Sequence, residues 1–357
     1  MSKRVVVVAS GMPPEHLHRV QPGADVCIDW TSDRRNALVS ISEITSRCQV
    51  EPPGIIQDLF DIAVAVYLAD IAILRGKNED WTRSIDLLIP VRDPAFWQAK
   101  AAILNRTLHE LTRDNFSLEF TAHSGERFYE FDCPGSDTPD CVSALSGGID
   151  SMAGAVMLLR ADRRPLLITH QSGNPYVRRA RDRVVETLDE FRPGQSTAVC
   201  ATIQPRRNGD DAWSFPPAEQ RENSRRSRAF LFISLTLLAA VCAGVSEVYV
   251  CDNGVLTVAL PLTDGRVGSL STRSTHPVVI AGINSLLEGA GVSVRVANPF
   301  VYQTKAELIG DILRPVLTPA EIQQTVSCWM TGRRSRQCGG CIPCLLRRIS
   351  MLAAGLP

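Results

Sequence analysis

The second half of the chain alternates short apolar runs with longer blocks that carry apolar residues at helical spacing. Short continuous apolar runs are typical of buried strands, and the longer blocks are typical of helices. Strands that alternate with helices in this way predict a parallel, doubly wound sheet, whose ligands bind at the carboxyl ends of the strands. The strand-like runs are residues 141–145, 165–169, 197–203 and 247–251, and the helix-like blocks are residues 152–159, 177–191 and 227–243.

The most apolar block, residues 229–245, is only just long enough to cross a membrane. Gly244 indicates the end of a helix, and the residues 247–250 that follow are typical of a strand. We therefore predict a fully buried helix that feeds the parallel sheet, and no membrane span.

The first 135 residues have a different pattern and predict a separate N-terminal α+β domain. A stretch rich in proline, glycine, serine and aspartate, residues 132–140, is a linker by composition. The elements predicted before it are strands at 4–9 and 85–89, helices at 55–74 and 94–113, and a hairpin formed by 116–120 and 127–131.

One turn between a predicted strand and a predicted helix has the residues of a phosphate-binding loop. Its two glycines let the backbone approach an anion closely, and the N–H groups at the following helix start point at that anion. The serines can add hydroxyl donors, whereas the aspartate is expected to act through a metal ion or a backbone N–H. The pattern is neither a Walker loop nor a dinucleotide fingerprint, and an ordinary Gly-Gly turn is the alternative. The loop residues are Ser146, Gly147, Gly148, Asp150 and Ser151.

Four cysteines near the C-terminus have the spacing of a metal site. Cys338, Cys341 and Cys344 form C-x2-C-x2-C, which lets one tight turn present three thiolates, and Cys328 can complete the set. Four thiolates are typical of a structural zinc site and also suit an iron–sulfur cluster. We expect Zn²⁺ because the chemistry predicted elsewhere is not redox chemistry; free thiols are the remaining alternative.

Composition adds few constraints. The 357 residues suggest about two domains, and Lys plus Arg equal Asp plus Glu at 38 each, so net charge favours neither a nucleic-acid nor a membrane partner. Eleven cysteines in a chain whose first residues do not read as a signal peptide indicate reduced thiols, and we expect a cytoplasmic protein.

The loop and the cysteines, in this order, resemble the 7-cyano-7-deazaguanine synthase family of PP-loop ATP pyrophosphatases. Ser227-Arg228 resembles the family's segment that opens a buried helix, and residues 304–307 resemble its Thr-Lys-Ala-Glu segment. Ser327-Cys328-Trp329 is similar to the start of the family's zinc site. The resemblance covers residues 141–357 and is carried by several motifs in combination.

This resemblance implies an adenine-nucleotide α-hydrolase-like, Rossmann-like parallel sheet with a C-terminal zinc-binding segment at about residues 328–344. It implies ATP, Mg²⁺ and Zn²⁺ as cofactors and a C–N ligase that forms AMP and pyrophosphate. In the implied reaction, a 7-carboxy-7-deazaguanine attacks the α-phosphate of ATP. Asp150, Arg228 and Lys305 are the implied catalytic residues, with Arg228 and Lys305 neutralising charge at the α-phosphate or the substrate carboxylate.

The chain departs from the family in its N-terminal extension and in a missing Gly-Tyr-Pro-Asp-Cys-Arg segment. These departures resemble a divergent branch found in bacterial anti-phage defence operons. That branch implies amide formation with a protein amine, with the N-terminal domain docking a co-encoded acceptor protein. In place of the missing segment stand donor-rich residues that predict a substrate site, or else a Ser/Thr-rich surface loop: Asp252, Asn253, Thr272, Arg273, Thr275 and His276.

Three other functions stay open at this point. A housekeeping synthase would use ammonia and continue to the nitrile, 7-cyano-7-deazaguanine. A PP-loop enzyme acting on tRNA would need tight nucleic-acid binding, against which the balanced charge argues. A catalytically degenerate nucleotide-binding partner protein would bind ATP without releasing pyrophosphate. A homodimer is compatible with each of these functions.

Overall fold

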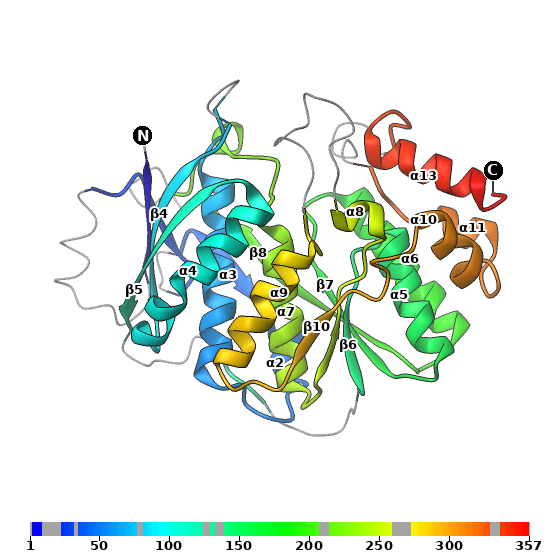
Figure 1. Cartoon of the computed structure of the whole chain (residues 1–357), viewed down its shortest axis with the longest axis horizontal. Helices are drawn as coiled ribbons and strands as arrows, with labels where there is room; N and C mark the ends of the chain where they lie inside the picture. Colours follow the sequence, from blue (N-terminus) through cyan, green and yellow to red (C-terminus); the bar gives the residue numbers. More distant parts are fainter. Residues whose placement is uncertain are drawn as a thin grey trace.

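Two sheets with helices packed between them make up the computed structural model of the chain (Figure 1). Helices α3 (Gly54–Ala72) and α4 (Pro94–Thr112) pack on the first sheet, and α7 (Arg228–Cys242) and α9 (Pro277–Gly289) pack on the second. Because α3 contacts α7 and α4 contacts α9, two layers of helices separate the sheets. The structure describes residues 2–8, 23–31, 35–76, 81–123, 129–132, 139–206, 214–258, 273–328 and 336–356.

The first sheet comes from the N-terminal part of the chain and is parallel, with the order β2-β1-β4-β5. Helix α4 connects β4 to β5 and brings the chain back to the end of the sheet where β4 begins. The two strands therefore run in the same direction. Of the hairpin predicted from 116–120 and 127–131, the first run is in β5, the described residues 129–131 are not in a strand, and residues 127 and 128 lie outside the described residues. The strands are β1 (Lys3–Val8), β2 (Val26–Asp29), β4 (Ser84–Val91) and β5 (Asn115–Ala122).

The two helices on this sheet form for different local reasons. α4 begins with proline at its first position, and the Asp93 carboxylate caps it by accepting a hydrogen bond from the Phe96 N–H at 2.9 Å. α3 is apolar on nearly every side because it lies between the first sheet and α7. Three buried residues of α3 are nevertheless aspartates, and each forms an ion pair with an arginine.

The second sheet has the order β10-β9-β6-β7-β8-β3 and is parallel except for β3. This confirms the predicted parallel, doubly wound sheet. Helices α5 (Ile149–Arg160) and α6 (Pro175–Phe191) lie on the side of this sheet away from α7 and α9 (Figure 1). The strands are β3 (Ala37–Ser40), β6 (Cys141–Ala144), β7 (Pro165–His170), β8 (Thr197–Pro205), β9 (Glu247–Tyr249) and β10 (Arg295–Ala297).

Strand β3 belongs to the N-terminal part of the sequence but lies in the second sheet. Its residues 37–40 pair antiparallel with residues 202–205, and the short helix α2 (Ser42–Thr45) follows against β8. One apolar cluster runs through both sheets and both helix layers between them. The predicted domain boundary near residue 135 stays a prediction, and the structure adds that the N-terminal part shares its core with the second sheet.

Helix α7 is the predicted apolar helix, and it is buried along almost its whole length. It stops before Gly244, whose φ of +69° lies in the region that favours glycine. α9 approaches α4 closely at Gly282, where an added Cβ would lie 2.2 Å from Thr107 Oγ1. In the part of the chain that the structure describes, every helix is too short or too polar to cross a bilayer.

The C-terminal segment packs against α5 and forms a second, smaller apolar cluster with it. It begins with a π-helical stretch, η5 (Leu308–Leu313), that continues directly from α10 (Lys305–Glu307). The other short helices are η3 (Ala218–Gln220), α8 (Gly254–Val258) and α11 (Pro319–Gln323), and the last helix is α13 (Ile342–Ala353).

The strand order of the second sheet reverses between β6 and β9. The chain runs from β6 to β7 and β8 on one side, and then crosses through α7 to β9 and β10 on the other. Such a reversal opens a crevice at the carboxyl ends of the two neighbouring strands. The predicted phosphate loop follows β6, and Asp252 and Asn253 follow β9, so the fold brings them to this crevice.

Candidate functional site

The loop after β6 has a shape that requires glycine at one position. Gly147 has a φ of +83°, and a Cβ there would lie 3.0 Å from the Cα of Arg181. The Ser146 N–H donates to the Ser151 hydroxyl at 3.2 Å, and that hydroxyl donates to the Gly148 carbonyl oxygen at 3.1 Å. The loop is thus closed by its own polar groups at the start of α5, and its role in phosphate binding stays a prediction.

Asp150, in the first turn of α5, is the centre of a buried polar cluster. Lys305 Nζ donates to its Oδ2 at 2.7 Å, and Asn253 Nδ2 donates to the same oxygen at 3.2 Å. The other carboxylate oxygen, Oδ1, is buried and accepts no hydrogen bond from the described residues. Asp150 therefore contacts side chains rather than the backbone N–H that the sequence offered as one of its partners.

A second carboxylate, that of Asp252, lies beside this cluster. Burial, together with the nearby charge of Asp150, raises the pKa of Asp252 to about 7, although Lys305 acts in the opposite direction. Thr275 Oγ1 donates to Asp252 Oδ2 at 3.1 Å. Two carboxyl groups thus lie near one ammonium group, and Asp252 at the end of β9 exchanges its proton near neutral pH.

Lys305 is held in place by the motif in which it lies. Thr304 caps the short helix α10, because its hydroxyl accepts from the Glu307 N–H at 3.3 Å while the Glu307 carboxylate accepts from the Thr304 N–H at 2.6 Å. The Thr-Lys-Ala-Glu sequence is therefore a capping box whose first helical residue is the lysine. This local structure fixes the backbone from which Lys305 reaches Asp150.

Asn298, which the sequence reasoning missed, orders the segment after β9. Its Nδ2 donates to the Asp252 carbonyl oxygen at 2.8 Å and lies 2.9 Å from Thr257 Oγ1. Its Oδ1 accepts from the Asp252 N–H at 3.3 Å. Asn298 directly follows β10, a three-residue strand that the sequence analysis did not predict; a polar residue directly after a strand is the signal that could have found it, because strand ends meet at the crevice.

Arg228 is the first residue of α7 and lies near the end of β7. Its guanidinium stacks on the Phe232 ring, 5.2 Å from the ring centre, and makes no ion pair or hydrogen bond with the described residues. Burial lowers the pKa of Arg228. A guanidinium in this condition is a suitable group to receive an anion.

His170, at the end of β7, is a second residue that the sequence reasoning missed. Its Nε2 lies 3.1 Å from the Ile203 carbonyl oxygen, and burial, with the nearby Arg228, lowers the pKa of His170 to about 3. The ring is therefore neutral and donates through Nε2, which leaves Nδ1 as an acceptor. That atom is buried and has no partner among the described residues.

The residues expected to bind substrate do not all lie together. Thr275 reaches Asp252, but Arg273 forms an ion pair with Glu110 of α4, and His276 caps α9 by accepting from the Val278 N–H at 3.3 Å. Thr272 lies outside the described residues. Arg273 and His276 thus face the N-terminal part of the molecule, and their substrate role stays a prediction without support from this geometry.

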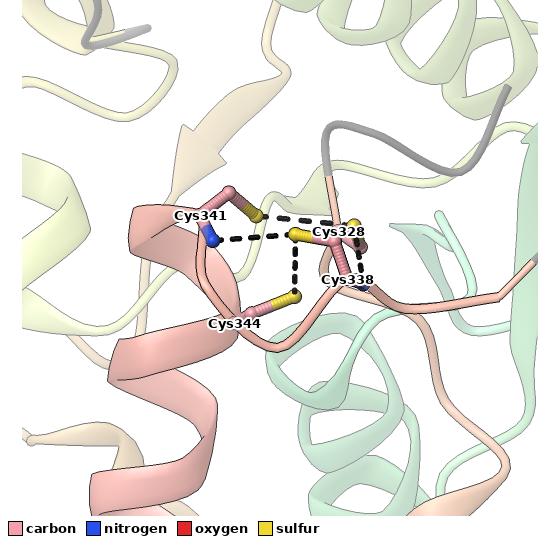
Figure 2. Close-up of side chains that lie close together, drawn as sticks. All are labelled: Cys328, Cys338, Cys341 and Cys344. Carbon is pink, nitrogen blue, oxygen red and sulfur yellow. Dashed lines mark hydrogen bonds between the residues drawn. The ribbon is translucent and has the colours of Figure 1, made fainter. Parts of the chain in front are cut away.

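The four predicted cysteines converge, and their ligand atoms all lie within 4.8 Å of one another (Figure 2). Cys341 Sγ lies 3.8 Å from Cys328 Sγ, and Cys338 Sγ lies 4.0 Å from Cys344 Sγ. Four sulfurs at about 2.3 Å from one Zn²⁺ in a tetrahedron would be separated by about 3.8 Å, so the arrangement fits zinc.

Backbone groups prepare this cluster for thiolates. The Cys341 N–H donates to Cys338 Sγ at 3.2 Å, and hydrogen bonds from the Gly340 and Cys341 N–H groups lower the pKa of Cys338 to about 6. Burial raises the pKa of Cys344 to about 12, which is the situation that a bound cation reverses. Four cysteines with donated backbone hydrogen bonds suit a structural metal site.

The cysteine cluster is connected to the phosphate loop. Arg347, one turn after Cys344, is buried, and its guanidinium donates to Thr325 Oγ1 and, at 2.9 Å, to the Gln323 carbonyl oxygen. Val326, which follows Thr325, donates its N–H to the Gly147 carbonyl oxygen at 3.0 Å. The segment that leads into the cluster therefore also buttresses the loop.

Part of the chain is similar to known proteins. Residues 274–355 match the family model of the queuosine biosynthesis protein QueC. A 7-cyano-7-deazaguanine synthase of Thiobacillus denitrificans is 28% identical over 130 residues, which are 36% of this chain and 54% of the relative. The corresponding synthase of Aromatoleum aromaticum is 29% identical over 131 residues, which are 37% of this chain and 54% of the relative.

The chain spans about half the length of the curated relatives that it matches. Its QueC-like part contains Lys305 and the four cysteines, whereas the loop at 146–151 precedes the matched residues. The resemblance inferred from the motifs is thus confirmed for this part, together with the PP-loop-type fold. The relation to anti-phage defence operons stays a prediction.

Proposed function

We propose that this protein uses ATP to activate a deazapurine carboxylate and then joins it to an amine. The observation that carries this proposal is the convergence of the phosphate loop, Asp150 and Lys305 at the strand reversal, in a chain whose next segment is QueC-like. A crevice at such a reversal is where sheets of this type hold nucleotides.

The proposed reaction has two steps. A carboxylate oxygen of 7-carboxy-7-deazaguanine attacks the α-phosphorus of ATP, the bond to the β-phosphate breaks, and pyrophosphate leaves. An amine nitrogen then attacks the carbonyl carbon of the acyl adenylate, AMP leaves with the electron pair of the C–O bond, and the amine loses a proton. Activation is needed because a free carboxylate is a poor electrophile.

The residues of this chain supply position and charge rather than covalent chemistry. N–H groups at the start of α5, with Ser146, Gly147, Gly148 and Ser151, hold the terminal phosphates. Lys305 and Arg228 neutralise charge at the α-phosphate or at the substrate carboxylate. Asp252 and Asn253 line the crevice on the side of β9.

Asp150 and Asp252 would hold Mg²⁺. The buried Oδ1 of Asp150, which accepts no hydrogen bond from the described residues, and the raised pKa of Asp252, about 7, fit a site that receives a cation. Mg²⁺ held by these two residues would offset the negative charge of the phosphates.

The amine belongs to a protein in the form of the proposal that we favour. The N-terminal part is packed directly on the second sheet, where it could dock a co-encoded acceptor protein in anti-phage defence. The QueC-like match favours a second candidate, a housekeeping synthase that uses ammonia to make 7-cyano-7-deazaguanine. Activation is the same in both candidates, which differ only in the nucleophile.

Pyrophosphate release tests the shared step. With ATP, Mg²⁺ and 7-carboxy-7-deazaguanine, we expect one pyrophosphate per AMP, and no release when the deazapurine is omitted. An inert protein under these conditions would contradict the proposal. Ammonia-dependent nitrile formation would select the housekeeping candidate, and a mass increase of a co-expressed neighbouring protein would select the protein amine.

A further inference from the structure

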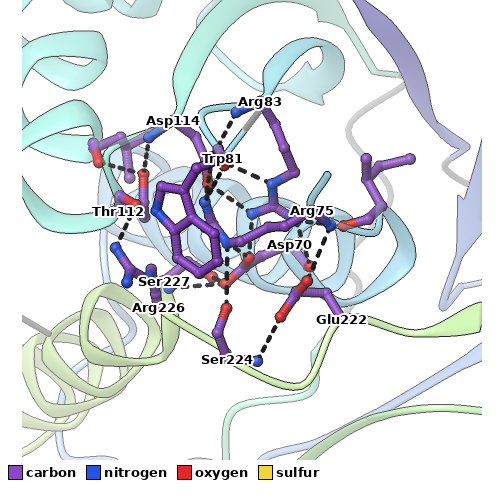
Figure 3. A network of polar contacts seen from close by, with 12 residues as sticks. Asp70, Arg75, Trp81, Arg83, Thr112, Asp114, Glu222, Ser224, Arg226 and Ser227 are labelled. Atoms are coloured by element: carbon purple, nitrogen blue, oxygen red, sulfur yellow. Dashed lines mark hydrogen bonds and ion pairs between the residues drawn. The ribbon is translucent and has the colours of Figure 1, made fainter. Parts of the chain in front are cut away.

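Helix α3 of the N-terminal part contacts the start of α7 through a buried carboxylate (Figure 3). Asp70 Oδ2 accepts a hydrogen bond from the Ser227 N–H at 2.9 Å and another from the Ser227 hydroxyl at 2.8 Å. Ser227 is fully buried and directly precedes Arg228. The carboxylate therefore fixes the backbone from which Arg228 projects.

Asp70 is itself held by a network of charged side chains. Arg83 pairs with both Asp70 and Asp114, and Arg75 forms two hydrogen bonds to Asp114, at 2.7 and 2.6 Å. The side chains of these four residues are at most 4% exposed. The two arginines and two aspartates balance in charge, so the network is electrically satisfied away from water.

The same network also holds residues 222–227, the segment that leads into α7. The Arg75 N–H donates to a Glu222 carboxylate oxygen at 3.0 Å, and the Glu222 N–H donates to the Ile71 carbonyl oxygen at 2.9 Å. Arg75 and Arg226 both stack on the Trp81 ring, at 5.0 and 4.8 Å from its centre. Residues 222–227 are thus fixed at both ends by the N-terminal part.

A second residue on the same face of α3 contacts the candidate site. Tyr67 lies three positions before Asp70, and its ring meets that of His170 edge to face, 5.8 Å between centres and at 88°. His170 in turn packs edge to face against Phe232, over which Arg228 stacks. One face of α3 therefore packs against His170 through Tyr67 and, through Asp70, holds Ser227, the residue before Arg228.

The value of this network lies in position rather than in stability. Buried ion pairs seldom stabilise a fold more than apolar residues of similar volume, because desolvation offsets their attraction. Their hydrogen bonds are directional, however, and here they end at the residue before Arg228. A guanidinium that must meet a developing charge loses effect when it is displaced by as little as 1 Å, by about a hundredfold.

We propose that Asp70 is a positioning residue for Arg228, so that the N-terminal part completes the site of the second sheet. This inference rests on the proposed role of Arg228 as the group that receives an anion. It assigns to the N-terminal part a function that does not depend on docking any partner.

A double-mutant cycle on the full-length protein tests the inference. Binding of α,β-methylene-ATP and of 7-carboxy-7-deazaguanine is measured by calorimetry for wild type, Asp70→Asn, Arg228→Ala and the double variant. For the ligand that Arg228→Ala weakens, we expect Asp70→Asn to weaken binding by about tenfold, the size of one lost hydrogen bond to a charged group. In the Arg228→Ala background, Asp70→Asn should change nothing further.

Two variants separate positioning from general loosening. Asp114→Asn perturbs the network without touching Ser227, and it should leave ligand affinity within about twofold while lowering stability. Ser227→Ala removes only one hydrogen bond to Asp70; it should weaken binding about threefold, and it serves if Asp70→Asn does not fold.

Several outcomes would overturn the inference. These are additive effects in the cycle, equal losses of affinity in Asp70→Asn and Asp114→Asn, and an Arg228→Ala variant that binds both ligands as wild type does. A non-additive cycle in a protein that releases no pyrophosphate would refute the proposed reaction but leave the inference standing. Pyrophosphate release with an additive cycle would do the reverse.

Discussion

The two parallel sheets of this molecule differ at their carboxyl edges. In the first sheet, the Asp58 carboxylate lies at the end of β4 and accepts hydrogen bonds from the Arg92 and Asp93 N–H groups and from Trp97 Nε1. Arg92 also pairs with Asp58 and with Asp61, to which the Tyr129 hydroxyl donates. The carboxylates at this edge are thus used in hydrogen bonds and ion pairs within the protein.

At the carboxyl edge of the second sheet, Asp150 Oδ1 is buried and accepts no hydrogen bond from the described residues, and His170 Nδ1 and Arg228 Nε likewise have no hydrogen-bond partner among them. Leaving such atoms unpaired costs about 1–3 kcal/mol each, so a protein retains them where a ligand completes the bonds. The difference between the edges therefore lies in their carboxylates: both oxygens of Asp58 and of Asp61 are hydrogen-bonded within the first edge, whereas Asp150 Oδ1 at the second accepts no bond from the described residues.

The largest expected effect is on turnover in Asp150→Asn. The amide keeps the shape but loses the charge that meets Lys305 and a cation, so we expect pyrophosphate release to fall about a thousandfold. The free energy of unfolding should fall by at most about 3 kcal/mol, because the pair with Lys305 is buried but Asp252 still offsets part of the Lys305 charge. Turnover is measured by coupled pyrophosphate detection and stability by urea denaturation; wild-type turnover would remove Asp150 from the site.

The converse change, Asp58→Asn, should act on stability alone. It breaks a buried pair with Arg92 and weakens several hydrogen bonds, so we expect the free energy of unfolding to drop by about 3 kcal/mol. Turnover of the folded protein should be unchanged, as denaturation and kinetics on the same sample will show. Lost turnover without lost stability would mean that the first edge is also a ligand site.

Arg347→Lys examines how the second edge is supported. Lysine cannot make the fork of hydrogen bonds to Thr325 and Gln323, so the segment against Gly147 loosens and affinity for an ATP analogue should fall about tenfold. Elemental analysis should still find about one zinc per chain, because all four cysteines remain. Loss of zinc together with affinity would instead place the effect at the metal centre.

The smallest expected effect is a pH dependence caused by Asp252. The pKa of Asp252 is about 7 in the folded protein and 3.8 in the unfolded chain. Between these pH values the folded state holds a proton that the unfolded state has lost, so stability falls as pH rises from about 4 through 7. Between pH 6 and 8 the loss should be about 1.4 kcal/mol, and Asp252→Asn should not show it.

Asp61, whose pKa is also raised to about 7 by burial, is present in both proteins and cancels from that comparison. Urea denaturation at the two pH values measures the difference. Identical pH dependence in wild type and Asp252→Asn would show that this carboxyl is ionised throughout.

The sequence predicted the features whose signal is local. The phosphate loop, the four cysteines and the strand–helix alternation of the second sheet each lie within short windows, where spacing reports geometry directly. His170 and Asn298 could have been found as polar residues at strand ends. Their partners, Ile203 and Asp252, are set by packing between strands and leave no periodic pattern.

The contacts between the two parts could not be predicted in this way. Asp70 and Ser227 lie 157 positions apart, and an aspartate inside an apolar helix indicates only that some partner exists. The four-residue strand β3 is short and partly exposed, so its pairing with β8 is decided by which edge is available. The predicted separate N-terminal α+β domain rested on a local change of pattern and on the composition of residues 132–140, and neither indicates that a strand of one part pairs with the sheet of the other.

Strand β3 has a practical consequence for dissecting this molecule. A fragment that starts at residue 139 would keep every motif that suggested a function, yet it would expose the edge of the nine-residue strand β8 that β3 covers. A bare, regular edge of this kind pairs readily with another copy. Aggregation of such a fragment would therefore indicate the loss of β3 and not a defect in the candidate site.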